Sequence, residues 1–190
     1  MSTPTKQEAM DAIDLLLRYI GTDTHNEHFR DTAKRVISSY SQIYGGYNID
    51  IADIFDLKSY NSADFQDVIL MKNIKFHSTC AHHMLPISGT ASISYIPNTK
   101  IIGISKLVRV VDMFAKRLQV QETLTAQIAN AIQENLEPLG VAVKISASHY
   151  CMVMRGVNQQ SALLDTYHFT GIFNQDRQYR NDFINSIDRG

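Results

Sequence analysis

Both cysteines of this 190-residue chain lie next to histidines, at spacings that suit the binding of one metal ion. In Cys80-Ala81-His82-His83 a thiol and an imidazole are three residues apart, so a single turn can bring both to one ion. In His149-Tyr150-Cys151 an imidazole and a thiol are two residues apart, and on a predicted strand both would point to one face. Thiolate and imidazole ligands favour zinc. A structural zinc site uses four protein ligands, whereas a catalytic site uses three and leaves a position for water.

From these two clusters we select Cys80, His83 and Cys151 as the metal ligands. His82 and His149 would then be free imidazoles beside the ion, available for proton transfer. The alternative is that each cysteine is a small core residue and each histidine a hydrogen-bonded one. Metal binding is the better interpretation, because the two clusters together contain every cysteine of the chain.

A second group of residues could hold phosphates. The segment Gly103–Arg109 enters a predicted helix, with Ser105 as its candidate N-cap and with Lys106 and Arg109 on one face, away from the apolar stripe. The N-terminus of a helix with a lysine and an arginine suits a polyphosphate, although a basic helix face is more often simply solvated. Arg155, four residues after Cys151, could add a third cation.

Gln121 and Glu122 open the next predicted helix. A carboxylate there could accept the paired N–H donors on one edge of guanine. The alternative is that Glu122 is an ordinary acid in a first turn, favoured by the helix dipole.

The elements that must position these residues change in type along the chain. Apolar residues at helical spacing predict one helix over residues 6–20 and a second from Thr32, its candidate cap, to about residue 43. They belong to an expected N-terminal helical layer over residues 1–60. Strand-like stretches then follow at 67–76, 89–97 and 141–154, around helical stretches at 104–117 and from about 119 to 138, and residues 174–190 predict a short polar helix or tail. This order predicts the α+β class.

The overall composition excludes several classes of protein. Lys and Arg number 18 against 19 Asp and Glu, so no basic footprint for a nucleic-acid polymer or an acidic membrane surface is expected. No apolar run reaches the roughly 20 residues of a membrane span. The first residues lack the apolar core of a secretory signal, which predicts a cytoplasmic protein. Two cysteines are too few for a disulfide framework.

These segments, in this order, resemble the GTP cyclohydrolase I family. The resemblance covers roughly residues 70–157 and departs from the family at Ala81, where the family usually has glutamate. The matching pieces are Cys80–His83, Tyr95–Pro97, Gly103–Arg109, Arg117–Thr125 and His149–Val157.

The resemblance implies a tunnelling fold, in which an antiparallel sheet carries two long helices on one face. The catalytic unit would span residues 61–190. Subunit sheets would join into a barrel, and two face-to-face pentamers would form a homodecamer with active sites between subunits.

The resemblance also implies a reaction. A zinc ion, one per subunit, on Cys80, His83 and Cys151 would make hydroxide available near neutral pH for attack on C8 of GTP. The products would be formate and 7,8-dihydroneopterin triphosphate, the first step of pterin synthesis toward tetrahydrofolate or biopterin. His149 would protonate N7, and His82 would move protons at the ribose and formyl groups. The triphosphate and ribose would bind Ser105, Lys106, Arg109 and Arg155, and the guanine edge would bind Gln121 and Glu122.

Two alternatives stay open at this point. The chain could be a diverged paralogue that acts on an altered purine nucleotide or stops at the ring-opened intermediate, because Ala81 removes a carboxylate next to the ligands. It could instead be a non-catalytic nucleotide-binding subunit that regulates an oligomer. The intact set of two cysteines and three histidines speaks against the second alternative.

Overall fold

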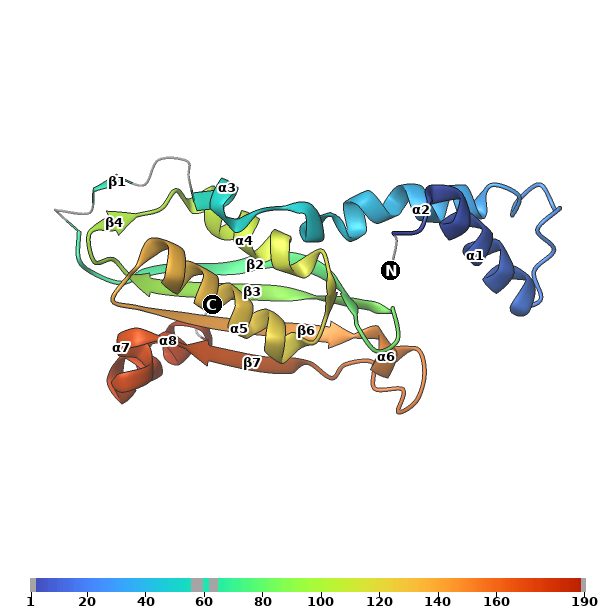
Figure 1. Cartoon of the computed structure of the whole chain (residues 1–190). Helices are drawn as coiled ribbons and strands as arrows, with labels where there is room; N and C mark the ends of the chain where they lie inside the picture. Colours follow the sequence, from blue (N-terminus) through green and yellow to red (C-terminus); the bar gives the residue numbers. More distant parts are fainter. Residues whose placement is uncertain (1–2, 56–59, 62–64, 189–190) are drawn as a thin grey trace. The chain divides into compact units, whose positions relative to one another are not determined.

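A computed structural model describes residues 3–55, 60–61 and 65–188, and it divides between Gly45 and Gly46 into two units (Figure 1). Within the described residues, no helix is both long and apolar enough to cross a membrane.

The N-terminal unit consists of two helices, α1 (Lys6–Tyr19) and α2 (Thr32–Ile43), which pack against each other. The start of α1 is fixed by a capping box, in which Thr5 and Glu8 satisfy each other's backbone N–H groups. Both helices were expected from their apolar spacing. Thr32 is not the cap of α2, because the helix begins at Thr32 itself, after Asp31.

The second unit is built on a five-stranded sheet in the order β5-β2-β3-β6-β7. All neighbours are antiparallel except the short β5, which is parallel to β2. A separate ribbon pairs β1 (Tyr60–Asn61) with β4 (Lys100–Ile101). The sheet strands are β2 (Ile69–Cys80), β3 (Pro86–Ile96), β5 (Leu118–Gln119), β6 (Gly140–His149) and β7 (Leu164–Phe169).

Two long helices, α4 (Ile104–Ala115) and α5 (Gln121–Leu136), cover one face of this sheet (Figure 1). The short α3 (Ile51–Phe55) packs on both of them. The other helical segments of the unit are α6 (Tyr150–Val153), α7 (Gly171–Gln175) and α8 (Arg177–Asp188), and the short η1 (Gly45–Asn48) spans the division between the two units. The α+β prediction is confirmed, with strands and helices in the expected order.

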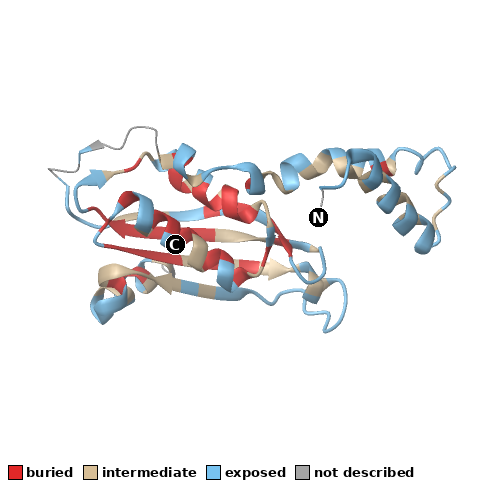
Figure 2. Ribbon diagram, in the orientation of Figure 1, coloured by how far each residue is buried: buried red, intermediate tan, exposed pale blue. Residues whose placement is uncertain are grey.

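The main core lies between the sheet and these two helices, where Figure 2 shows the buried residues concentrated. Every second residue of β6, such as Val143 and Ile145, meets Leu124 and Ile128 of α5 in this core. A smaller core on the opposite face joins Ala142 to the aromatic rings of α7 and α8. The two faces of β6 thus pack into two different cores. The end of β6, at His149, lies beside the start of α5, at Gln121.

Two further expected element boundaries, besides the cap of α2, are wrong. The strand predicted to run to residue 154 ends at His149, and residues 150–153 form α6 instead. The last pair in this ladder is His149 with Ile87, and the neighbouring strand β3 begins at Pro86, which has no N–H to extend the pairing. At α4, the N-cap is Gly103, and Ser105 lies inside the first turn.

Candidate metal centre and active site

Three potential metal ligands converge at one end of the sheet. Cys80 is the buried last residue of β2, His83 lies in the turn that follows, and Cys151 lies in α6. Their ligand atoms all lie within 4.8 Å of one another, and Cys80 Sγ is 3.8 Å from His83 Nδ1. The turn is closed by backbone bonds of 2.8 and 2.9 Å between Cys80 and residues 84–85, with Met84 in the left-handed conformation.

This donor set fits zinc. Two ligands at about 2.3 and 2.0 Å from a tetrahedral zinc ion lie about 3.5 Å apart, close to the observed sulfur–nitrogen distance. Burial raises the pKa of the Cys151 thiol, and the neighbouring Cys80 raises it further, although Arg155 opposes this shift. A metal ion bound here would favour the thiolate form of Cys151, because its positive charge opposes this rise in pKa.

Arg155 contacts the metal-ligand cluster directly. Its Nη1 lies 3.0 Å from Nε2 of His83. Because a guanidinium can only donate, Nε2 of His83 is the acceptor. The structure therefore places Arg155 beside Cys80, His83 and Cys151. His82 is also here, with its ring edge-on to that of His83 at a centroid distance of 6.2 Å.

His149 lies at the end of β6 and is held by Gln121. Its Nε2 is 2.7 Å from Oε1 of Gln121. Burial lowers the pKa of His149, and the negative charge of the exposed Glu122 opposes this shift. His149 is therefore neutral over more of the pH range than a solvent-exposed histidine.

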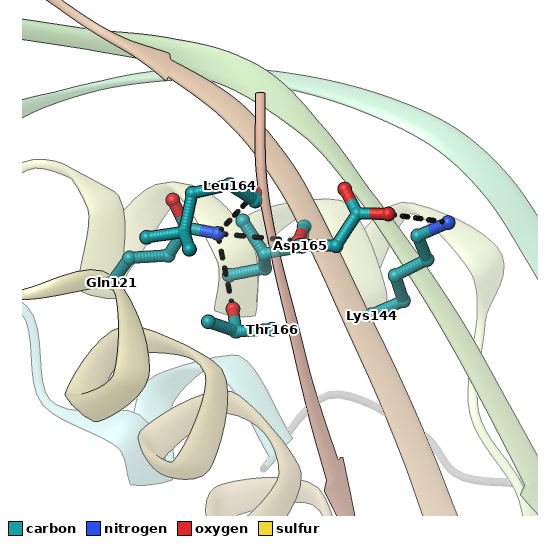
Figure 3. Close-up of polar contacts among 6 residues, drawn as sticks. Gln121, Lys144, Leu164, Asp165 and Thr166 are labelled. Atoms are coloured by element: carbon teal, nitrogen blue, oxygen red, sulfur yellow. Dashed lines mark hydrogen bonds and ion pairs between the residues drawn. The ribbon is translucent and has the colours of Figure 1, made fainter. Parts of the chain in front are cut away.

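The side chain of Gln121 faces the sheet instead of solvent, and only 1% of the residue is exposed. Its amide nitrogen donates to the carbonyl oxygens of Leu164 (2.8 Å) and Ile145 (3.2 Å) and to Oγ1 of Thr166 (3.1 Å) (Figure 3). In this structure, the donors and the acceptor of the Gln121 amide are therefore engaged within the protein. Of the two residues expected at a guanine edge, Glu122 is the one with an exposed side chain.

The expected phosphate residues occupy different environments. Ser105 and Arg109 are exposed on α4, whereas Lys106 is buried and its Nζ donates to the carbonyl of Ile54 at 3.0 Å. The expectation of an exposed basic face is therefore wrong for Lys106. The reason is that α3 ends against α4, and the free carbonyls at the end of a helix attract a cation. Arg109 lines a cavity of about 260 Å³ with Ile49, Asp53, Ile54, Asp112 and Lys116.

The expected phosphate residues lie on the first half of α4, whereas the metal ligands lie beyond its last turn. Ser105 is in the first turn of the helix, and the chain leaves its last turn to form β5, whose Gln119 pairs with Cys80. Ala115 is ten positions beyond Ser105, a rise of about 15 Å. One chain therefore brings Cys80, His83, Cys151, His82, His149 and Arg155 together. Ser105 lies in the far turn of α4, Lys106 is bonded to Ile54, and Arg109 lines a cavity that contains none of these six residues.

Sequence reasoning missed the residues that hold Gln121. Thr166 lies on β7, a strand that was not predicted, and Thr125 lies one turn beyond Gln121 on α5. Their hydroxyl oxygens are 2.6 Å apart. The four-residue spacing of Gln121 and Thr125 was a usable signal, because residues at this spacing share one helix face.

Comparison with known proteins gives one family and many close relatives. The family model described as GTP cyclohydrolase I matches residues 9–188. The proteins named GTP cyclohydrolase 1 from Rickettsia felis and Rickettsia africae are each 54% identical to this chain over 185 residues, which cover 97% of this chain and 97% of the relative. The protein of that name from Rickettsia bellii is 54% identical over 182 residues, or 96% of this chain and 95% of the relative.

Proposed function

The chain belongs to the GTP cyclohydrolase I family and is a GTP cyclohydrolase I, and we propose that Cys80, His83 and Cys151 hold a catalytic zinc ion. One observation carries this proposal: two thiols and an imidazole from separate elements converge within 4.8 Å. Three protein ligands leave one position of a tetrahedral zinc ion for water, as a hydrolytic site requires. When bound, zinc lowers the pKa of such a water to near 7.

The residues around this cluster have roles in the conversion of GTP and water to 7,8-dihydroneopterin triphosphate and formate. His149 would deliver a proton to N7 of the guanine, which makes C8 a better electrophile. Its partial burial and its bond to Gln121 hold the ring in one place. His82 is exposed next to His83 and is free to move protons at the ribose and formyl groups.

Substrate binding on this proposal uses two copies of the chain. Arg155 and Glu122 would act on the same chain as the metal ligands. Arg155 would bind the phosphates, and Glu122 would bind the guanine edge. Ser105 lies in the first turn of α4 and Arg109 about one turn further along, and we place both at the metal centre of a neighbouring subunit. Lys106 would join them only after leaving the carbonyl of Ile54. Because one chain does not bring these groups together, we place the active sites between the subunits of the expected homodecamer of two pentamers.

The test is a product assay with the full-length chain. Zinc-loaded protein is incubated with GTP, and formate and the fluorescent, oxidised neopterin product are measured together. We expect both products, their loss after chelation and their recovery with zinc. Consumption of GTP without release of formate would instead support the alternative that the enzyme stops at the ring-opened intermediate because of Ala81. GTP binding without any chemistry would contradict the proposed function.

A further inference from the structure

We propose that Gln121 is the positioning residue that fixes the imidazole of His149, so that Nδ1 is the nitrogen that exchanges a proton with the substrate. This role rests on the proposed function, because it assumes that His149 acts on GTP. It differs from the role expected from the sequence, in which Gln121 binds the guanine edge.

The surroundings of the Gln121 amide allow only one orientation of its oxygen and nitrogen. A side-chain amide can often be turned over without changing its fit, because its oxygen and nitrogen are alike in size. Here the nitrogen faces the backbone carbonyls of Leu164 and Ile145, at 2.8 and 3.2 Å, and a carbonyl can only accept. The turned-over amide would put its oxygen against both. The nitrogen must therefore face these carbonyls, and the oxygen must face His149.

Two threonine hydroxyl groups, on Thr125 and Thr166, support this amide, and Figure 3 shows the contact with Thr166. Oγ1 of Thr125 donates to the backbone carbonyl of Gln121 at 2.7 Å. Its single proton is then used, so the 2.6 Å contact between Thr125 and Thr166 takes its proton from Thr166. The oxygen of Thr166 is left to accept from the Gln121 amide at 3.1 Å. The donor and the acceptor of both threonine hydrogen bonds are thus assigned, and both assignments agree with the same orientation of the Gln121 amide.

The orientation of the Gln121 amide determines which ring nitrogen of His149 carries the hydrogen. Oε1 of Gln121 can only accept, so Nε2 of His149 must carry the hydrogen of the 2.7 Å bond. In the neutral ring the lone pair is then on Nδ1. When His149 acts as an acid and a base in turn, Nε2 keeps its hydrogen and only Nδ1 changes. The ring is held from α5, and α5 is held to β6 and β7 by the same amide.

The burial of this network explains why it can fix an orientation. Gln121 and Thr125 are each only 1% exposed, so water cannot replace a lost partner. An unsatisfied polar group at such depth costs about 1–3 kcal/mol. Turning the amide over would set its oxygen against two carbonyl oxygens, and turning the His149 ring away would leave Oε1 of Gln121 without its donor.

The variant that tests this role is Gln121→Met in the full-length, zinc-loaded protein. It keeps the size of the side chain and removes the acceptor for His149. We expect kcat to fall about 100-fold, as for other small misplacements of a reacting group, with KM for GTP and zinc content changed less than about twofold. A rise in KM with unchanged kcat would overturn the proposal and return Gln121 to the guanine edge.

A matched control separates positioning from general loss of structure. Gln133 lies at the other end of α5, where its amide also donates to a backbone carbonyl, that of Pro138, and accepts from a threonine, Thr170. Gln133→Met removes the same kinds of bond about 18 Å away along the helix. We expect it to leave kcat within about twofold of the unmodified chain. An equal fall in kcat in both variants would contradict the positioning role.

A spectroscopic measurement tests the tautomer without any turnover. Nitrogen chemical shifts of histidine-labelled protein distinguish the Nδ1–H and Nε2–H forms, and a His149→Gln variant assigns the signal. We expect the Nε2–H form in the unmodified chain and a mixture in Gln121→Met. An Nδ1–H form in the unmodified chain would overturn the proposal even if GTP is converted. If no formate is produced, the proposed function fails, while the tautomer remains measurable.

Discussion

At the residue scale, the candidate metal centre depends on three donors, and each has a different surrounding. Cys80 is buried, Cys151 is half-buried, and His83 is exposed beside Arg155. Loss of one thiol leaves two donors, too few for a stable zinc site. His149 is near the cluster but is not one of the converging ligands. Metal binding and proton transfer should therefore be separable by mutation.

Cys151→Ser and His149→Ala form the pair that tests this separation. We expect Cys151→Ser to lose zinc and activity together. We expect His149→Ala to keep its zinc and to lose activity about 10²–10⁴-fold, the range for a general acid or base. Metal content by atomic absorption and formate release are measured on the same samples. Zinc loss in His149→Ala would contradict the ligand assignment.

Ala81→Glu tests the departure from the family pattern. Ala81 is exposed in the turn between β2 and β3, so a longer side chain has room there. A carboxylate at this point could orient the imidazole groups of His82 and His83, and such supporting contacts are often worth tenfold or more. We expect kcat for GTP to rise about tenfold. Ala81→Gln is the uncharged control, and an unchanged rate in Ala81→Glu would show that the carboxylate is dispensable here.

Local spacing predicted part of this site, and contacts between distant segments decided the rest. Cys80 and His83 are joined by one short turn, so their spacing was sufficient. The burial of Lys106 depends on the carbonyl of Ile54, which is 52 residues away in sequence. The engagement of Gln121 likewise depends on β7. No pattern around Lys106 or Gln121 carries information about these partners.

At the element scale, the sheet was predicted where strands alternate cleanly and missed where they do not. In β3 and β6 the apolar residues recur at every second position, because one face lies on α4 and α5. β7 is an edge strand, and both of its faces contain polar residues, such as Asp165 on one face and Thr166 on the other. Its sequence therefore shows no clear alternation of apolar and polar residues. The long helices α1, α2, α4 and α5 were predicted close to their observed bounds from their apolar spacing, whereas α6 lies in a segment predicted as a strand.

Gly89→Ala tests the close packing between β3 and β6. A Cβ at Gly89 would meet the backbone oxygen of Ser146 and the Cβ of Ala147, so the strands would have to move apart. We expect the free energy of unfolding to fall by about 1–3 kcal/mol, measured by denaturant titration. Gly45→Ala is the control, because a Cβ there meets nothing within 4 Å. Equal stability of the two variants would contradict this packing.

Asp165→Asn tests the pairing of β6 with β7 through pH. Burial raises the pKa of Asp165, but hydrogen bonds from Ser146 and Lys144 and the charge of Lys144 outweigh it and lower the pKa below its usual value. The Lys144–Asp165 ion pair is 3.1 Å long (Figure 3). Because the folded pKa is the lower one, the stabilisation is complete above the unfolded pKa of about 3.9. It is lost as the pH falls through the folded pKa.

We therefore expect Asp165→Asn to destabilise the protein near neutral pH and to match the unmodified chain in acid. The carboxylate is 42% exposed, so solvent screening keeps the difference below about 1 kcal/mol. Thermal unfolding of both proteins across the acidic range measures it. A difference that stays constant down to the lowest pH would rule out an electrostatic origin.

At the scale of the whole molecule, the residues expected to bind one GTP lie in two places. The α+β class followed from the order of elements, since helices and strands alternate in blocks along the chain. The distribution of the site over the fold could not be predicted in this way. Ser105 and Cys80 lie 25 positions apart in sequence, but only the last turn of α4 leads into β5 beside Cys80, so its first turn lies about 15 Å further along the helix.

Mixed oligomers test whether one active site uses two chains. We expect Cys151→Ser and Arg109→Ala each to be inactive alone, the first without zinc and the second without a phosphate ligand. If a site takes Cys151 from one chain and Arg109 from its neighbour, random co-assembly restores about a quarter of the sites, because each position is intact half of the time. Formate release by co-expressed, co-purified chains measures this recovery. If instead both residues serve a site within one chain, every site carries one defect and mixing restores no activity.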